Sequence, residues 1–405
     1  MYRYLRKYIV NVAIAVGALS LLISFAKFDH CRNTGWGAPG EYVHACYSDI
    51  PSLLTARGLS THTWPYASGN QSVEYPPITG IVMWATSYLT PHDAHQYVNY
   101  FDVNAILIAI LFLITVYILQ RARPDIWYLF PLAPAVVGSL FINWDMWAVL
   151  PAVYAIIQFD KKRYDRSAIA LGISIATKFF PIVLLLPIAL IFRSHKRYRQ
   201  GVRYLVVATA TWLLINLPIA LTTPTGWWYF FSFNSHRGMD WGSIWYGFDV
   251  FGIHLTNINF LSLFLFILGS AFYALYFLSL KCAPKLSQTA FFMVALFTIA
   301  SKVYSPQYIL WLTPVAVLAL SYRNEKRDWR DFWIWQGCEL VYHIAIWEFL
   351  ALGAGARFGI STKVYAVALF ARVIALIWFT IRLGRESTPE IAPQTLEFLG
   401  TAIEG

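Results

Sequence analysis

Long apolar segments recur along this chain, and they constrain its fold more than any other feature. A helix that crosses a bilayer needs about 20 predominantly apolar residues, and several segments meet or approach that length. Hydrophobic residues make up 58% of the 405 residues and charged residues only 13%, about half the charged fraction of an ordinary soluble domain. A soluble protein of this size cannot bury so much apolar surface. The composition therefore excludes a soluble enzyme and a disordered or disulfide-dense chain.

The apolar segments predict an all-α, polytopic membrane protein with about 11–12 transmembrane helices. A short apolar stretch at 78–89 is interpreted as an interfacial helix, because a full crossing there would leave Arg121 and Arg123 outside. We expect one domain over 1–385 and a mobile cytoplasmic tail at 386–405. The predicted spans are 8–26, 98–119, 126–143, 146–159, 167–177, 180–192, 204–221, 261–280, 286–300, 308–321, 332–352 and 364–381.

The excess of Lys and Arg, and its placement along the chain, predict how these spans are oriented in the membrane. A net charge of +10 is shared by nucleic-acid-binding proteins, but membrane proteins collect Lys and Arg on their cytoplasmic side. On the predicted topology, 22 of the 31 Lys and Arg residues lie on the cytoplasmic side and eight lie outside. Both termini are therefore predicted to be cytoplasmic, and no nucleic-acid partner is expected.

Two long outer loops, 27–97 and 222–260, hold seven of the nine histidines. Loops rich in functional side chains are typical of binding and catalytic sites. Between 126 and 192 the predicted helices are short, and such helices usually line a polar site. Polar residues stand at helix junctions on the same side, among them Asp145, Lys178 and Lys302. Several converging there favour a polar site, although any one of them could simply reach water.

Asp49 and Glu74 are the carboxylates best placed to act as a base. Asp49 follows the first span, and a carboxylate there can deprotonate a hydroxyl if its pKa suits the task. The alternative is a structural role for each carboxylate, because Asp49 could cap the next helix and Glu74 stands beside Pro76 and Pro77, where a helix is expected to start.

The cysteines and aromatic residues give weaker signals. Cys31 and Cys46 fall in the first outer loop, so a disulfide between them is plausible in an oxidising compartment. Asp240 and Trp241 belong to a segment that mixes aromatic rings with polar groups, a blend that suits a sugar, although interfacial belts explain most such aromatics. The sequence contains no Cys/His zinc spacing, Walker loop or GxGxxG motif.

Several short motifs follow one another in an order that resembles a known family. Asp49 lies just beyond the first span and precedes Pro65-Tyr66 and then Tyr75-Pro76-Pro77, which opens a short apolar helix. Polar blocks follow at 143–145, 177–181 and 302–308. From about 8 to 382 this order is similar to glycosyltransferase family 87, integral membrane proteins that include actinobacterial polyprenol-phosphate-mannose-dependent α-mannosyltransferases.

The resemblance implies a GT-C-type helical bundle, a polyprenyl-phosphate sugar donor, and a glycolipid or glycan acceptor. It also implies catalysis at the outer face of the plasma membrane, in cell-envelope biosynthesis, without a nucleotide or bound metal. In such enzymes an outer-loop aspartate deprotonates the acceptor hydroxyl and the sugar is transferred with inversion. Asp49 matches that aspartate.

Basic residues on the same face would hold the donor phosphate, an electrostatic contribution that is often large. Better-known mannosyltransferases of the family have a histidine where Gln307 stands. Mannose is therefore the first expectation, and arabinosyl or other pentosyl transfer stays open. The predicted donor- and substrate-binding residues are Lys178, Arg237, Lys302, Tyr304, Gln307 and Arg357, with Glu74, Tyr75, Asp145, Asp240 and Trp241 as further candidates.

A transporter or flippase of a lipid-linked sugar is the alternative function. Broken helices and buried charges fit it as well, but transporters commonly show related halves. No such repeat is visible in this sequence.

Overall fold

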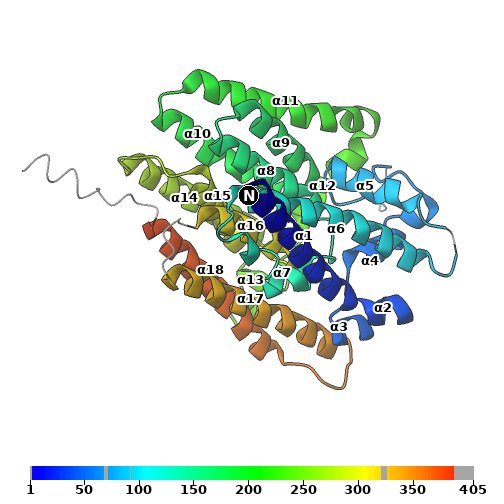
Figure 1. The fold of residues 1–405 in the computed structure, drawn as a ribbon. Helices are drawn as coiled ribbons and strands as arrows, with labels where there is room; N and C mark the ends of the chain where they lie inside the picture. Colours follow the sequence, from blue (N-terminus) through cyan, green and yellow to red (C-terminus); the bar gives the residue numbers. More distant parts are fainter. Residues whose placement is uncertain (1, 68–71, 92, 321–325, 387–405) are drawn as a thin grey trace, which may run out of the picture.

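The computed structural model describes residues 2–67, 72–91, 93–320 and 326–386, and within these ranges it is helical with no strand (Figure 1). The prediction of an all-α fold is confirmed for this part of the chain. Apart from Glu386, the predicted tail at 386–405 lies outside the described residues.

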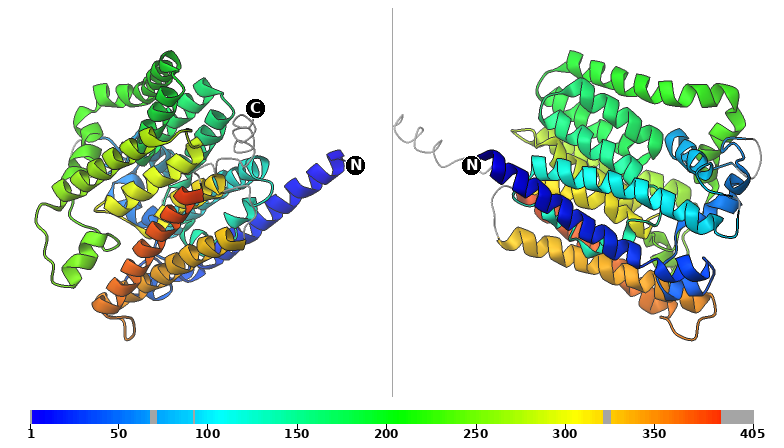
Figure 2. Two further views of the ribbon diagram at one scale, coloured as in Figure 1. Left: turned by 90° about the vertical axis from the view of Figure 1, so that its left-hand side faces the viewer. Right: turned by 45° about the vertical axis from the view of Figure 1, so that its right-hand side comes forward.

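Long helices run along one another and form the body of the molecule (Figure 2). Four of them, α6, α11, α14 and α18, are long and apolar enough to cross a membrane. Their outward faces are apolar, as at Leu214 of α11 and Leu263 of α14, which are both well exposed. The long helices are α1 (Tyr2–Ala26), α6 (Gln96–Ala122), α11 (Tyr198–Thr222), α14 (Ile258–Ser279), α17 (Lys326–Gly353) and α18 (Thr362–Glu386).

Shorter apolar helices form the core. The α8 helix has 15 residues, about 22 Å at 1.5 Å per residue, which is less than the roughly 30 Å hydrocarbon core of a bilayer. Most residues of α8, α15 and α16 are buried. The short helices are α8 (Met146–Asp160), α9 (Tyr164–Thr177), α10 (Leu185–Ser194), α15 (Leu286–Ala300) and α16 (Ile309–Ala319).

The predicted span at 126–143 is wrong. This segment holds a 3-10 turn, η2 (Trp127–Leu129), and the six-residue helix α7 (Pro134–Ser139). Pro131 and Pro134 explain the break, because proline has no amide hydrogen and disfavours helical geometry in the preceding residue. Prolines also begin or enter η3 (Phe180–Leu184), which precedes α10, and η4 (Pro306–Tyr308), which precedes α16.

Small helices gather at the end of the bundle opposite the N-terminus (Figure 2). We call this end the junction end, and it comprises the described residues of the connections at 27–67, 72–91, 93–95, 140–145, 178–179, 223–257, 301–308 and 354–361. Backbone hydrogen bonds join these connections, from Asp49 to Ile142 (2.8 Å) and from Asp240 to Lys302 (2.8 Å). Its small helices are α2 (Asp29–Thr34), α3 (Gly40–Val43), α4 (Asp49–Ala56), η1 (Leu59–Thr61), α5 (Pro77–Ser87), α12 (Pro224–His236) and α13 (Ile244–Val250).

Candidate active site

The start of α4 places Asp49 at the junction end. The Ser48 hydroxyl accepts a hydrogen bond from the Ile50 amide (3.2 Å) and donates one to the Phe141 carbonyl (2.8 Å). Ser48 is therefore the residue that caps α4, and the capping role considered for Asp49 is wrong. The Asp49 carboxylate is left to interact with side chains from other segments.

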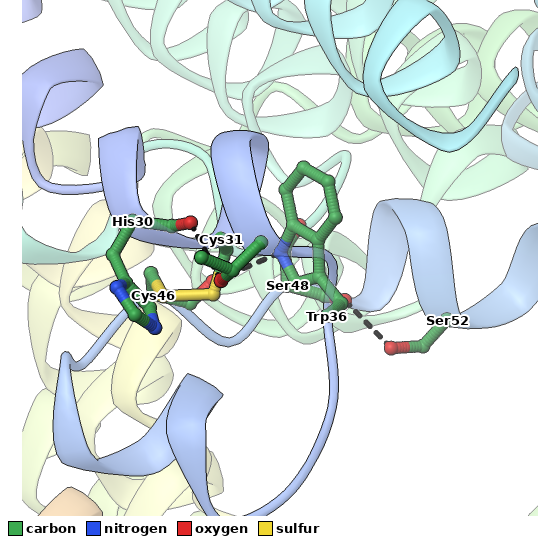
Figure 3. The surroundings of a disulfide bond; sticks show 7 residues. His30, Cys31, Trp36, Cys46, Ser48 and Ser52 are labelled. Atoms are coloured by element: carbon green, nitrogen blue, oxygen red, sulfur yellow. Dashed lines mark hydrogen bonds between the residues drawn. A yellow bond between two sulfur atoms is a disulfide. The ribbon is translucent and has the colours of Figure 1, made fainter. Parts of the chain in front are cut away.

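A disulfide anchors the segment that precedes α4 (Figure 3). Cys31 of α2 and Cys46 are bonded, with Cα atoms 6.0 Å apart. The Trp36 indole donates to the Cys46 carbonyl (3.0 Å), and both cysteines are fully buried. Cys46 lies three residues before Asp49, so the bond fixes the approach of the chain to the candidate base.

Burial and four neighbours set the ionisation of Asp49, which is partly buried: Tyr47, Lys178, Glu74 and Asn143. Burial raises the pKa of its carboxyl group to about 6, against the hydrogen bond from Tyr47 and the positive charge of Lys178. The Tyr47 hydroxyl donates to Oδ1 (2.8 Å), and the Asn143 amide donates more weakly to Oδ2 (3.4 Å). A carboxylate of this kind is ionised at neutral pH and is still basic enough to accept a proton.

Lys178 and Asp145 form an ion pair beside Asp49. Their charged atoms lie 2.7 Å apart, and the Asp145 side chain is completely buried. The Asp145 amide donates to the side chain of Asn143 (2.9 Å), which links the pair to Asp49. The Lys178 ammonium also lies 4.5 Å from the ring centre of Tyr75. A buried pair of this type is costly to break, so it fixes a positive charge near the base.

Glu74, the rival carboxylate, is paired with Arg57 at 2.7 Å. Both side chains are largely buried. The pairing makes Glu74 a weaker candidate for the base than Asp49, although its negative charge still raises the pKa of Asp49.

A second polar cluster joins the connections at 237–243 and 301–308. The Ser305 hydroxyl donates to Asp240 (3.0 Å). The Lys302 ammonium donates to the carbonyls of Asn234 (2.6 Å) and Arg237 (2.8 Å) and to the side chain of Asn259. An ammonium has three donors, so Lys302 holds these two connections together instead of presenting a donor to a phosphate.

Arg237 is the more available cation in this cluster. Its guanidinium lies 5.5 Å from the ring centre of Phe233, and within the described part of the chain no carboxylate pairs with it. Burial of the Lys302 amine, together with the positive charge of Arg237, lowers the pKa of Lys302 to about 8. Of the predicted phosphate-binding residues in this cluster, Arg237 is therefore the one that can still take an anion.

The predicted substrate residue Tyr304 lies beneath this surface. It is fully buried, and its hydroxyl donates to Glu339 of α17 (2.7 Å). Arg372 of α18 pairs with Glu339 (3.2 Å) and donates to the Tyr304 carbonyl (3.1 Å). Gly242 packs against the same carbonyl, where a Cβ would lie 2.1 Å from its oxygen. Tyr304 is thus a support for the connection that carries Ser305 and Gln307.

Tyr308 connects the two clusters. The charges of Asp145, Arg237 and Asp240 all act on its hydroxyl, and its ring stacks on Trp311 at 3.7 Å. Gln307, one residue before it, is buried with a side-chain oxygen that has no hydrogen-bond partner among the described residues. The two clusters are therefore parts of one polar region at the junction end.

The remaining predicted residues, Trp241 and Arg357, are more exposed to solvent. Trp241 is about half exposed, at 48%, and its carbonyl accepts from Tyr365 of α18 (2.9 Å). Arg357 is exposed in the connection between α17 and α18, and within the described ranges it contacts neither cluster.

Sequence reasoning missed Tyr47, Glu339 and Arg372. Tyr47 lies two residues before Asp49, and nothing in its sequence context marks it as a partner of that residue. Glu339 and Arg372 do carry a signal, because ionisable residues inside apolar spans are rare and usually functional.

The comparisons with known proteins are sparse. No family model matches the chain, so the resemblance to glycosyltransferase family 87 stays a prediction. No curated protein matches it either. Among solved structures it is similar to the crystal structure of ArnT from Cupriavidus metallidurans bound to undecaprenyl phosphate. The match has 14% sequence identity and a TM-score of 0.44, and it covers 92% of this chain and 78% of that chain.

The arrangement suits proton abstraction next to a bound anion. The Asp49 carboxylate can accept a proton, and the cationic side chains of Lys178 and Arg237 lie in the same polar region. Positive charge fixed where negative charge develops is the larger contribution to catalysis in many enzymes. Transfer of a group from an anionic leaving group to a hydroxyl needs both.

Proposed function

We propose that this protein is a membrane glycosyltransferase that moves a single sugar from a polyprenyl-phosphate donor to a lipid or cell-envelope glycan acceptor. Mannose is the donor sugar that the sequence resemblance implies. We further propose that the junction end faces outward from the plasma membrane and that the N-terminus is cytoplasmic. The observation that carries the proposal is the Asp49 carboxylate, held by Tyr47 and Asn143 beside the Lys178–Asp145 pair.

The reaction follows from this geometry. The acceptor hydroxyl gives its proton to Asp49 as its oxygen forms a bond to the anomeric carbon of the sugar. The bond between that carbon and the phosphate oxygen breaks, and its electrons leave with the polyprenyl phosphate. Attack opposite the leaving group inverts the anomeric configuration. Lys178 and Arg237 stabilise the negative charge that grows on the departing phosphate.

The test is transfer by the purified full chain in lipid vesicles, with radiolabelled polyprenyl-phosphate mannose and isolated membrane acceptors. We expect a labelled product of one added sugar. Asp49→Asn should lower the rate by about 10²–10⁴-fold, the usual contribution of a general base, with an unchanged elution profile and thermal transition. Asp102→Asn is the matched control, since Asp102 of α6 pairs with Arg32 of α2 (2.6 Å) and not with a neighbour of Asp49. Wild-type transfer by Asp49→Asn would overturn the assignment of the base.

A transporter of a lipid-linked sugar would give a different result. The protein would then move the labelled lipid across the vesicle bilayer, and no covalent product would form. Arabinosyl or other pentosyl donors are compared in the same transfer assay, because Gln307 replaces the histidine expected for mannosyl transfer.

A further inference from the structure

An apolar groove opens on the side of the molecule between α1, α7 and α17. Its volume is about 510 Å³. Most of its lining is apolar, and four of the apolar residues are about half exposed, at 47–57%: Leu19, Ile23, Leu132 and Ile344. The polar residues that line it are Ser20, Ser24, Lys27, His343 and Glu348. Along α1 the groove extends from Leu19 to Lys27, about 12 Å at 1.5 Å per residue. Its length and apolar walls fit part of an alkyl or isoprenoid chain that enters from a bilayer.

A single lysine stands at the end of the groove nearest the junction end. Lys27 follows the last residue of α1, and its ammonium donates one hydrogen bond, to the Gly138 carbonyl (2.6 Å). Two of its three donors remain, and in the described part of the chain no carboxylate lies within ion-pair distance of it. Glu348 and His343 also line the groove, and in the described ranges neither is paired with Lys27. Burial lowers the pKa of Lys27 to about 7, which an anionic ligand would reverse.

The groove leads to the candidate base. Tyr42 of α3 and Trp347 of α17 line it, and their rings stack at 6.3 Å. Trp347 also contacts the ring of Tyr47 at 5.7 Å. The Tyr47 hydroxyl donates to Asp49, so one residue separates the groove from the carboxylate. The Lys178–Asp145 pair is linked to the other oxygen of the carboxylate, because the Asp145 amide donates to Asn143 and the Asn143 amide donates to Oδ2 of Asp49.

We propose that the groove binds the acceptor and that the acceptor is a lipid with an anionic head group. Its chain lies between α1 and α17, its anion lies beside Lys27, and its head group extends beyond the groove, past Tyr47, to bring a hydroxyl to Asp49. The donor phosphate then lies on the opposite side, at Lys178, as inversion requires. This assignment rests on the proposed glycosyltransferase function, and it extends that function by naming the class of acceptor.

Photo-crosslinking tests the groove directly. The full chain is placed in phosphatidylcholine vesicles that contain a trace of diazirine-bearing phosphatidylglycerol or, in parallel, diazirine-bearing phosphatidylcholine. We expect the anionic lipid to label segments 131–138 and 340–348 at least threefold more than the neutral lipid does. Helix α14 serves as the internal reference, because its exposed face contacts ordinary boundary lipid and should show a ratio near one.

Three variants separate the groove from the surrounding surface. Lys27→Gln should lower the ratio at the groove to about one. Ile344→Trp should fill the groove and lower its labelling at least threefold. Leu263→Trp on α14, at a similarly exposed position of 58%, is the matched control and should change neither. Equal ratios at the groove and at α14, or an unchanged ratio in Lys27→Gln, would overturn the proposal.

Steady-state kinetics test whether the groove binds the acceptor of the transfer reaction. Ile344→Trp should raise the KM for the membrane acceptor at least fivefold and leave the donor KM unchanged. If transfer occurs and the acceptor KM does not move, the groove assignment fails and the glycosyltransferase function stands. If labelling follows the prediction and the wild type transfers no sugar, the function fails and the groove remains a lipid site.

Discussion

Replacing Tyr47 with phenylalanine tests how the site sets the basicity of Asp49. The change removes a hydroxyl that donates to the carboxylate at 2.8 Å and keeps the ring that packs on Trp347. A hydrogen bond to a charged group contributes about 1.5–3 kcal/mol, which corresponds to about 1–2 pKa units at 1.36 kcal/mol per unit. The loss disfavours the ionised form, so the pKa of Asp49 should rise from about 6.

The expected effect is a loss of activity that depends on pH. The base must be ionised, so the rate rises with pH through the pKa of Asp49 and reaches a plateau above it. A shift of about 1.5 units leaves roughly 9% of the carboxylates ionised at pH 6.5, against roughly 76% in the wild type, an approximately eightfold loss. At pH 9 both proteins should be nearly fully ionised and equally active.

The measurement is the initial rate of transfer under kcat/KM conditions between pH 5 and 9. Tyr97→Phe is the matched control, because it also removes a hydroxyl bonded to α4, at Thr55, away from Asp49. Its profile should follow the wild type. A Tyr47→Phe profile with the wild-type midpoint, or a loss of the same size at every pH, would refute the reasoning.

Three further predictions concern charge and covalent structure. Lys178→Met should cost about 3–5 kcal/mol of stability because it leaves Asp145 buried and unpaired; in thermal unfolding, Lys178→Met with Asp145→Asn should recover most of this while transfer stays lost. Arg237→Ala should raise the donor KM at least tenfold and Arg357→Ala should not, and equal effects in steady-state kinetics would remove Arg237 from the phosphate site. Cys46→Ser should cost about 2–4 kcal/mol and lower transfer; full activity in this variant would show that the disulfide does not support the site.

The sequence predicted the helices best where they are long and apolar. The span expected at 98–119 is α6, and the one at 286–300 is α15 with the same ends. The prediction failed at 126–143, where the composition is apolar but two prolines divide the segment. Hydropathy measures transfer into lipid, and it does not register that a proline removes an amide hydrogen.

The candidate site was predicted in part for a similar reason. The residue types at Asp49, Lys178 and Asp145 indicate a polar site at the helix junctions. Their partners do not, because Tyr47 and Asn143 contact Asp49 through a fold that sequence spacing alone does not specify. Lys302 shows the reverse case. Its ammonium was predicted to bind the donor phosphate, but in the structure it donates hydrogen bonds to three acceptors within the chain.

The disulfide between Cys31 and Cys46 has a consequence for when the candidate site reaches its final structure. Bonds of this kind persist in oxidising compartments and are reduced in the cytosol. On the proposed orientation, Cys31 and Cys46 can join only after residues 27–60 have crossed the membrane. The segment that presents Asp49 would therefore acquire its final support late in biogenesis. On the proposed function, a newly made chain whose cysteines are still reduced would therefore be less active than the mature protein.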